Sequence, residues 1–88
     1  MVLKLVYNEC ETLLNELLSV RDKYNFTLEA YDSRYLTERK KGYKVKGAFS
    51  ARLDPFVGVY DDEGTPIKGF YSEAGECNID NIIKYLKS

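Results

Sequence analysis

Histidine and tryptophan are absent from this 88-residue chain, and cysteine and proline occur only twice each. Without histidine there is no catalytic triad of the Ser-His-Asp type and no imidazole ligand for a metal ion. Two cysteines are also too few for a structural zinc site, which usually takes four Cys or His ligands. We therefore expect no metal site and no His-dependent catalysis.

Long apolar runs and an excess of one charge are also missing. No apolar run approaches the ~20 residues of a membrane-spanning helix, and the apolar stretch that follows Met1 is too short for a secretory signal. Thirteen basic and 14 acidic residues give a formal charge of -1, which argues against a polycationic protein that binds nucleic acid or a membrane surface. We expect a soluble cytoplasmic protein with reduced cysteines and no membrane partner.

What is present is an ordinary globular composition, with 44% hydrophobic and 31% charged residues. The length suits one domain over residues 1–88.

Residues 2–7 are almost all apolar and predict a strand that is buried on both faces. Asn8 with Glu11 three residues later has the spacing of a capping box and predicts the start of a helix. Apolar residues then recur at helical spacing, namely Leu13, Leu17, Val20 and Tyr24.

Residues 26–31 alternate and predict a second strand, which makes a βαβ unit with parallel strands and a right-handed crossover. The segment 33–53 is ambiguous: residues 33–41 favour a short helix that ends at Gly42, and residues 44–51 alternate weakly. Residues 56–60 and 66–72 flank a polar turn and predict an antiparallel hairpin. Asn78 or Asp80 then caps a last helix with one apolar face, formed by Ile79, Ile82, Ile83 and Leu86.

The order β-α-β-(α)-β-β-α and three short motifs resemble the glutaredoxin-like members of the thioredoxin-like superfamily, including the compact phage and bacterial type. Cys10 lies between the first strand and the first helix, Asp54-Pro55 precedes the hairpin, and Gly75-Glu76-Cys77-Asn78 precedes the last helix. The resemblance implies an α/β, thioredoxin-like fold with a four-stranded mixed sheet flanked by helices. It also implies a cis Asp54-Pro55 bond beside Cys10.

The resemblance further implies a thiol–disulfide oxidoreductase in which Cys10 is the nucleophile. Leu13 stands where a second cysteine would complete a CxxC motif, so the motif is of the monothiol type. A helix N-terminus would favour the Cys10 thiolate, and the neighbouring Glu9 and Glu11 would oppose it. Cys77 is a candidate second redox cysteine. The implied substrate-binding residues are Arg52, Asp54, Pro55, Gly75, Glu76 and Asn78, with Lys46 as a further cation that could attract a carboxylate. The implied substrate is a disulfide-containing or glutathionylated protein, with glutathione as an optional cofactor.

Two other hypotheses stay open. The chain is alternatively a non-catalytic thioredoxin-like binding module, since a lone cysteine is most often a small buried hydrophobe. A third hypothesis is a protein- or nucleic-acid-interaction domain that uses a basic cluster with one aromatic residue, formed by Arg39, Lys40, Lys41, Tyr43, Lys44 and Lys46. A solvated loop is the simpler interpretation of that cluster, and nucleic acid is not the expected partner.

Overall fold

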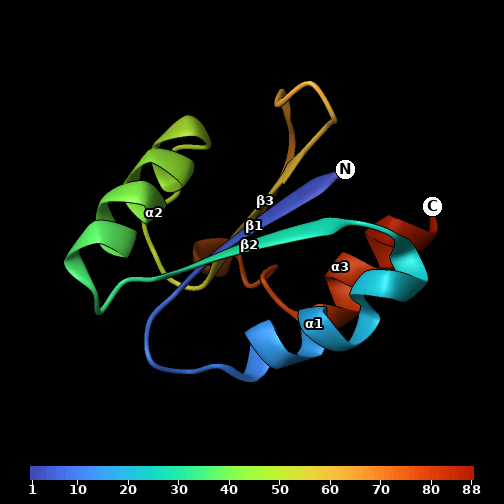
Figure 1. The fold of residues 1–88 in the computed structure, drawn as a ribbon, viewed down its shortest axis with the longest axis horizontal. Helices are drawn as coiled ribbons and strands as arrows, with labels where there is room; N and C mark the ends of the chain where they lie inside the picture. Colours follow the sequence, from blue (N-terminus) through green and yellow to red (C-terminus); the bar gives the residue numbers. More distant parts are fainter.

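The computed structural model describes all 88 residues and is an α/β fold with one open sheet (Figure 1). The elements follow in the order β1 (Val2–Tyr7), α1 (Thr12–Tyr24), β2 (Thr27–Asp32), α2 (Leu36–Ala48), β3 (Phe56–Tyr60), β4 (Pro66–Tyr71), the 3-10 turn η1 (Ser72–Ala74) and α3 (Ile79–Lys87). This is the predicted β-α-β-α-β-β-α arrangement. None of the helices is long and apolar enough to cross a membrane.

The sheet is mixed, with strand order β2-β1-β3-β4. β1 runs parallel to β2, with Leu5 opposite Ala30, and antiparallel to β3, with Leu5 opposite Val57. β3 and β4 form the antiparallel hairpin. The fold class is therefore confirmed, and the arrangement is compatible with a thioredoxin-like fold.

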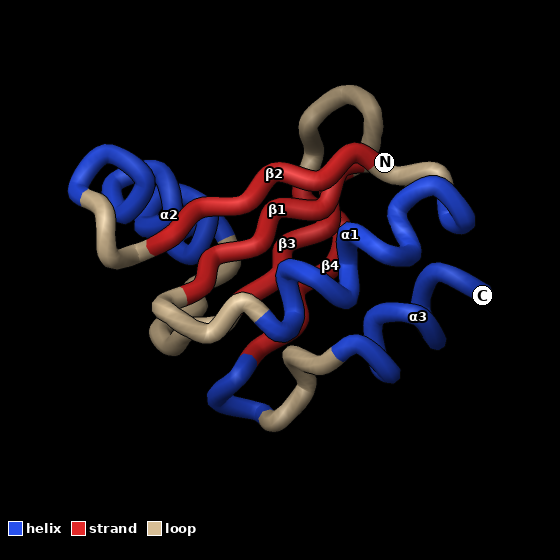
Figure 2. The backbone as a smooth tube through the Cα atoms, turned by 60° about the horizontal axis from the view of Figure 1, so that its bottom comes forward, coloured by secondary structure: helices blue, strands red, loops and turns tan.

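The helices cover both faces of the sheet: α1 and α3 lie side by side on one face, and α2 lies on the other (Figure 2). On β1, Leu3, Leu5 and Tyr7 belong to the main core with α1 and α3, whereas Val6 packs with Val45 of α2 and Phe56. This explains why the central strand is apolar at successive positions, since both of its faces are buried.

The prediction that a helix ends at Gly42 is wrong, because α2 continues to Ala48. Gly42 is buried, and a Cβ atom there would lie 2.8 Å from Cγ1 of Val6. The glycine allows the helix to approach β1 closely, which is a packing role that sequence cannot distinguish from a helix stop. The weak alternation of residues 44–51 is likewise mostly helix and not strand.

The predicted N-cap at Asn8 is also wrong. α1 begins at Thr12, and Glu11 occupies the N-cap position without a side-chain cap. Between β1 and α1 the chain turns sharply: Glu9 has a left-handed φ of 65°, and the Cys10 N–H donates to the Asn8 carbonyl at 2.7 Å. At α3 the predicted cap is correct, since the Asn78 side chain accepts from the Asn81 N–H at 3.0 Å.

Candidate functional site

A cavity of about 360 Å³ opens beyond the carboxyl end of β1. Val6 near the end of β1 is paired with Phe56 at the start of β3, which in turn is paired with Tyr71 at the end of β4. The loops that precede β3 and follow β4 therefore reach the same edge as the β1–α1 loop. Their residues line the cavity together: Tyr7, Asn8, Cys10, Thr12, Leu13, Glu16, Asp54, Pro55, Cys77, Asn78 and Ile79.

Cys10 is exposed and lies two residues before the first residue of α1. Its thiol donates to Oγ1 of Thr12 across 3.4 Å. Once the sulfur is deprotonated, the Thr12 hydroxyl and the Thr12 backbone N–H both donate to it, and these hydrogen bonds lower the pKa of Cys10. The carboxylate that raises this pKa is Glu16, one turn into α1, and not the neighbouring Glu9 or Glu11. The balance of these effects favours a thiolate.

Cys77 lines the same cavity but has a different environment. Burial raises the pKa of its thiol to about 12, although hydrogen bonds from Ser72 and from the Val57 N–H act in the opposite direction. Its side chain packs against the main core. A thiol with this pKa is neutral near pH 7, and a neutral thiol is a poor nucleophile.

Asp54 and Pro55 form one wall of the cavity, and the peptide bond between them is cis. The Asp54 carboxylate accepts from the Lys46 ammonium at 2.9 Å, and these side chains are 18% and 10% exposed, respectively. Lys46 is thus neutralised within the protein and is not free to attract a substrate carboxylate. The Pro55 carbonyl accepts a hydrogen bond from Ser72, whereas the backbone N–H and carbonyl of Asp54 have no partner in the chain.

Three of the predicted substrate-binding residues lie outside the cavity lining. The Arg52 N–H donates to the Glu73 carboxylate at 2.6 Å, which joins the loop before β3 to η1. Gly75 has a left-handed φ of 69° and terminates η1. The Glu76 N–H donates to the Tyr71 carbonyl at 2.9 Å, and its side chain lines a separate recess beside α3. These contacts hold the loops in place and do not bring the three residues to Cys10.

Sequence reasoning missed Thr12 and Glu16, the two side chains that act on the Cys10 sulfur. Both come from α1 at helical spacing, so their approach to Cys10 depends on the position at which the helix begins. Because the helix start was placed at Asn8, these residues were assigned no role. Tyr7, at the end of β1, also lines the cavity, and burial raises the pKa of its hydroxyl.

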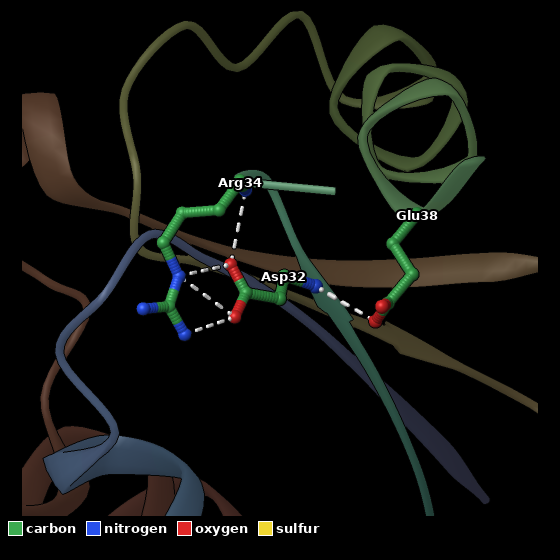
Figure 3. A network of polar contacts seen from close by, with 3 residues as sticks. All are labelled: Asp32, Arg34 and Glu38. Carbon is green, nitrogen blue, oxygen red and sulfur yellow. Dashed lines mark hydrogen bonds and ion pairs between the residues drawn. The ribbon is translucent and has the colours of Figure 1, made fainter. Parts of the chain in front are cut away.

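A second polar network, also missed, fixes the end of β2 beside the β1–α1 loop (Figure 3). The buried Asp32 carboxylate accepts from Arg34 Nη2 at 2.6 Å, from Nε at 3.1 Å and from the Arg34 backbone N–H at 3.0 Å. The Asp32 N–H donates to Glu38 at 3.1 Å. The hydrogen bonds from the side chain and backbone of Arg34 lower the pKa of Asp32. The Arg34 guanidinium is engaged in this network and does not line the cavity.

Comparison of the chain with protein-family models, with curated proteins and with solved structures found no match. No group of three or more cysteine or carboxylate side chains is placed to hold a metal ion.

Proposed function

We propose that this protein is a small glutaredoxin-like thiol–disulfide exchange protein of the monothiol type, with Cys10 as its nucleophile. The observation that carries the proposal is an exposed cysteine whose pKa is lowered by Thr12, at the mouth of a cavity that Asp54 and Pro55 complete. The α/β fold, with this cavity at the carboxyl end of β1, supports the same proposal.

The chemistry is an exchange of one disulfide for another. The Cys10 thiolate attacks one sulfur of a substrate disulfide, an S–S bond forms between them, and the other substrate sulfur leaves as a thiolate that takes a proton from water. A second thiol, from glutathione or from another protein, then attacks the mixed disulfide and releases Cys10. Because the Cys77 thiol is neutral near pH 7, we assign the second step to an external thiol.

Asp54 gives the site a means of holding an extended substrate. Asp54 lines the cavity and its backbone N–H and carbonyl have no partner in the chain, and an extended peptide can pair with such groups in the manner of an added strand. The lining contains no lysine or arginine, so the two carboxylates of glutathione would find no cationic side chain there. Of the two substrates that the resemblance implies, we therefore favour a disulfide-containing protein over a glutathionylated one, in a reducing compartment such as the cytoplasm.

The test measures the rate at which iodoacetamide alkylates Cys10 at a series of pH values. The reaction is monitored by mass spectrometry in the Cys77→Ser variant, in which Cys10 is the only cysteine. We expect a thiol pKa below the ~8.5 of a free cysteine and a mixed disulfide with a model disulfide substrate. Cys10→Ser is the control and should lose both reactions. A Cys10 that titrates at or above the pKa of a free thiol would refute the proposal.

A non-catalytic binding module is the second candidate. The Glu16 carboxylate favours this candidate, because its charge raises the pKa of Cys10 and so disfavours the thiolate. The two candidates differ in the behaviour of Cys10→Ser. A binding module would retain its affinity for an extended peptide in that variant, and wild-type Cys10 would exchange no faster than an unfolded control peptide of the same local sequence.

A further inference from the structure

Helix α2 carries a concentration of positive charge that the proposed function does not use. Five of the thirteen basic residues of the chain lie in this helix, against one acidic residue, Glu38. α2 lies on the face of the sheet opposite α1 and α3 (Figure 2). The chain as a whole has a formal charge of -1, so α2 carries a local excess of positive charge.

Folding determines which of these cations are free to bind a partner. Lys46 is paired with Asp54, and Arg39 is half-buried. Lys40, Lys41 and Lys44 are exposed, and their i,i+3 and i,i+4 spacing places them along one side of the helix. The helix thus presents a continuous row of ammonium groups in place of the solvated loop that the sequence suggested.

This row of lysines borders a recess between α2 and the sheet. A cavity of about 240 Å³ is lined by Lys4, Tyr31, Lys41, Lys44, Val45 and Tyr60, and no acidic side chain is among them. The Glu29 carboxylate pairs with two of the lining residues: it accepts from the Tyr31 hydroxyl at 2.5 Å and lies 3.8 Å from the Lys4 ammonium. Lys4 also lies over the Tyr60 ring, 4.5 Å from its centroid.

We propose that the row of exposed lysines on α2, formed by Lys40, Lys41 and Lys44 and here called the α2 basic face, binds the phosphate backbone of single-stranded nucleic acid. Ammonium groups are common donors to phosphate oxygens. The recess is concave and partly aromatic, so a flexible strand can enter it with a sugar–phosphate unit, which the rigid backbone of a duplex cannot do as readily. The net charge of the whole chain argues against such binding, and the local excess of positive charge on α2 is what supports it.

The experiment is fluorescence anisotropy of a labelled single-stranded oligonucleotide over a range of salt concentrations, with the full-length chain. Three phosphate contacts predict a slope of log K against log salt of roughly −2. Lys41→Gln with Lys44→Gln should reduce the magnitude of that slope by about 1.4 and weaken binding at low salt by at least about tenfold. The matched control is Lys84→Gln with Lys87→Gln, which removes two exposed charges from α3 and should bind like wild type.

We expect both double variants to fold, since all four substituted lysines are exposed. Circular dichroism checks that they do. The proposal is overturned if wild type does not bind at low salt, if the two double variants weaken binding equally, or if a duplex of the same length binds more tightly than the single strand. Displacement of the oligonucleotide by polyglutamate at equal charge concentration would also overturn it, because the face would then select charge alone and suit an acidic protein.

Discussion

At the scale of single residues, the reactivity of Cys10 depends on two neighbours that act in opposite directions. Thr12 supplies the hydrogen bonds that favour the thiolate, and Glu16 supplies the charge that disfavours it. Both effects are local and solvent-exposed, so each is expected to be modest and to be separable by a single substitution.

Replacing Thr12 with valine removes the hydroxyl and keeps the backbone N–H. We expect the pKa of Cys10 to rise toward that of a free thiol and alkylation near pH 7 to slow, because a smaller fraction of the sulfur is then thiolate. The measurement is the pH profile of iodoacetamide alkylation. Thr27→Val, on an exposed edge-strand position, should leave the profile unchanged, and an unchanged profile in Thr12→Val would show that the hydroxyl has no role.

Replacing Glu16 with glutamine tests the charge of the cavity. Wild-type Cys10 should react faster with cationic cystamine than with anionic dithiodipropionate, and the ratio of the two rates should fall by about two- to fivefold in Glu16→Gln, the effect of one exposed charge. Stopped-flow exchange rates at low salt provide the comparison. Glu63→Gln, in the β3–β4 turn, makes the same change in net charge away from the cavity. The idea fails if both variants change the ratio equally.

At the scale of elements, α2 is the least predictable part of the chain. Only Gly42, Val45 and Lys46 are buried in it, so its sequence lacks the apolar stripe that marks α1 and α3. Its position depends on close contact with β1, and two glycines in the same helix allow that contact to be tested.

Gly42→Ala places a methyl group against Val6, where the Cβ atom would lie 2.8 Å from Cγ1. We expect a loss of about 1–3 kcal/mol in the free energy of unfolding, the usual cost of overpacking. Gly47→Ala has open space around the added atom and should raise stability by up to about 0.5–1 kcal/mol, since alanine favours the helix. Urea unfolding followed by circular dichroism measures both. If Gly42→Ala were as stable as wild type, the close approach of α2 to β1 would be wrong.

At the scale of the whole molecule, native contacts hold several carboxyl groups in their charged form. Arg34 lowers the pKa of Asp32, the N-terminal ammonium of Met1 lowers that of Asp62, and backbone N–H groups of Glu73 and Arg52 lower that of Glu73. A carboxyl group whose pKa is lower in the folded chain stabilises the fold above its unfolded pKa. That stabilisation is lost as the pH falls through the folded pKa.

We therefore expect the urea midpoint to be nearly constant between pH 7 and pH 6 and to fall steadily below about pH 5, as the unfolded chain binds more protons than the folded one. Asp32→Asn should make this fall smaller, because one of the three carboxyl groups no longer titrates. Asp22→Asn, whose carboxylate is fully exposed, is the control. Midpoints that are equal at pH 7 and pH 3 in wild type would contradict the assignment.

The sequence by itself determined the strands and helices in which buried apolar residues recur at a regular spacing. The apolar run of β1, the helical stripe of α1, the β3–β4 hairpin and the capped start of α3 all follow from local patterns, and the bounds of β1 and of the hairpin were predicted nearly to the residue. Parallel pairing of β1 and β2 also follows, because a βαβ unit allows few other arrangements. The resemblance to the thioredoxin-like fold, which this order supports, implied that the loops carrying Cys10, Asp54 and Cys77 lie at one edge of the sheet.

Only the tertiary structure decided which side chains meet there. It moved the start of α1 from Asn8 to Thr12, paired Lys46 with Asp54, and left Arg52, Gly75 and Glu76 outside the cavity lining. It also turned the ambiguous basic segment into a helix with Gly42 against Val6. Sequence periodicity reports whether a residue is buried, whereas hydrogen bonds, ion pairs and close contacts depend on distances between segments that only the packed chain establishes.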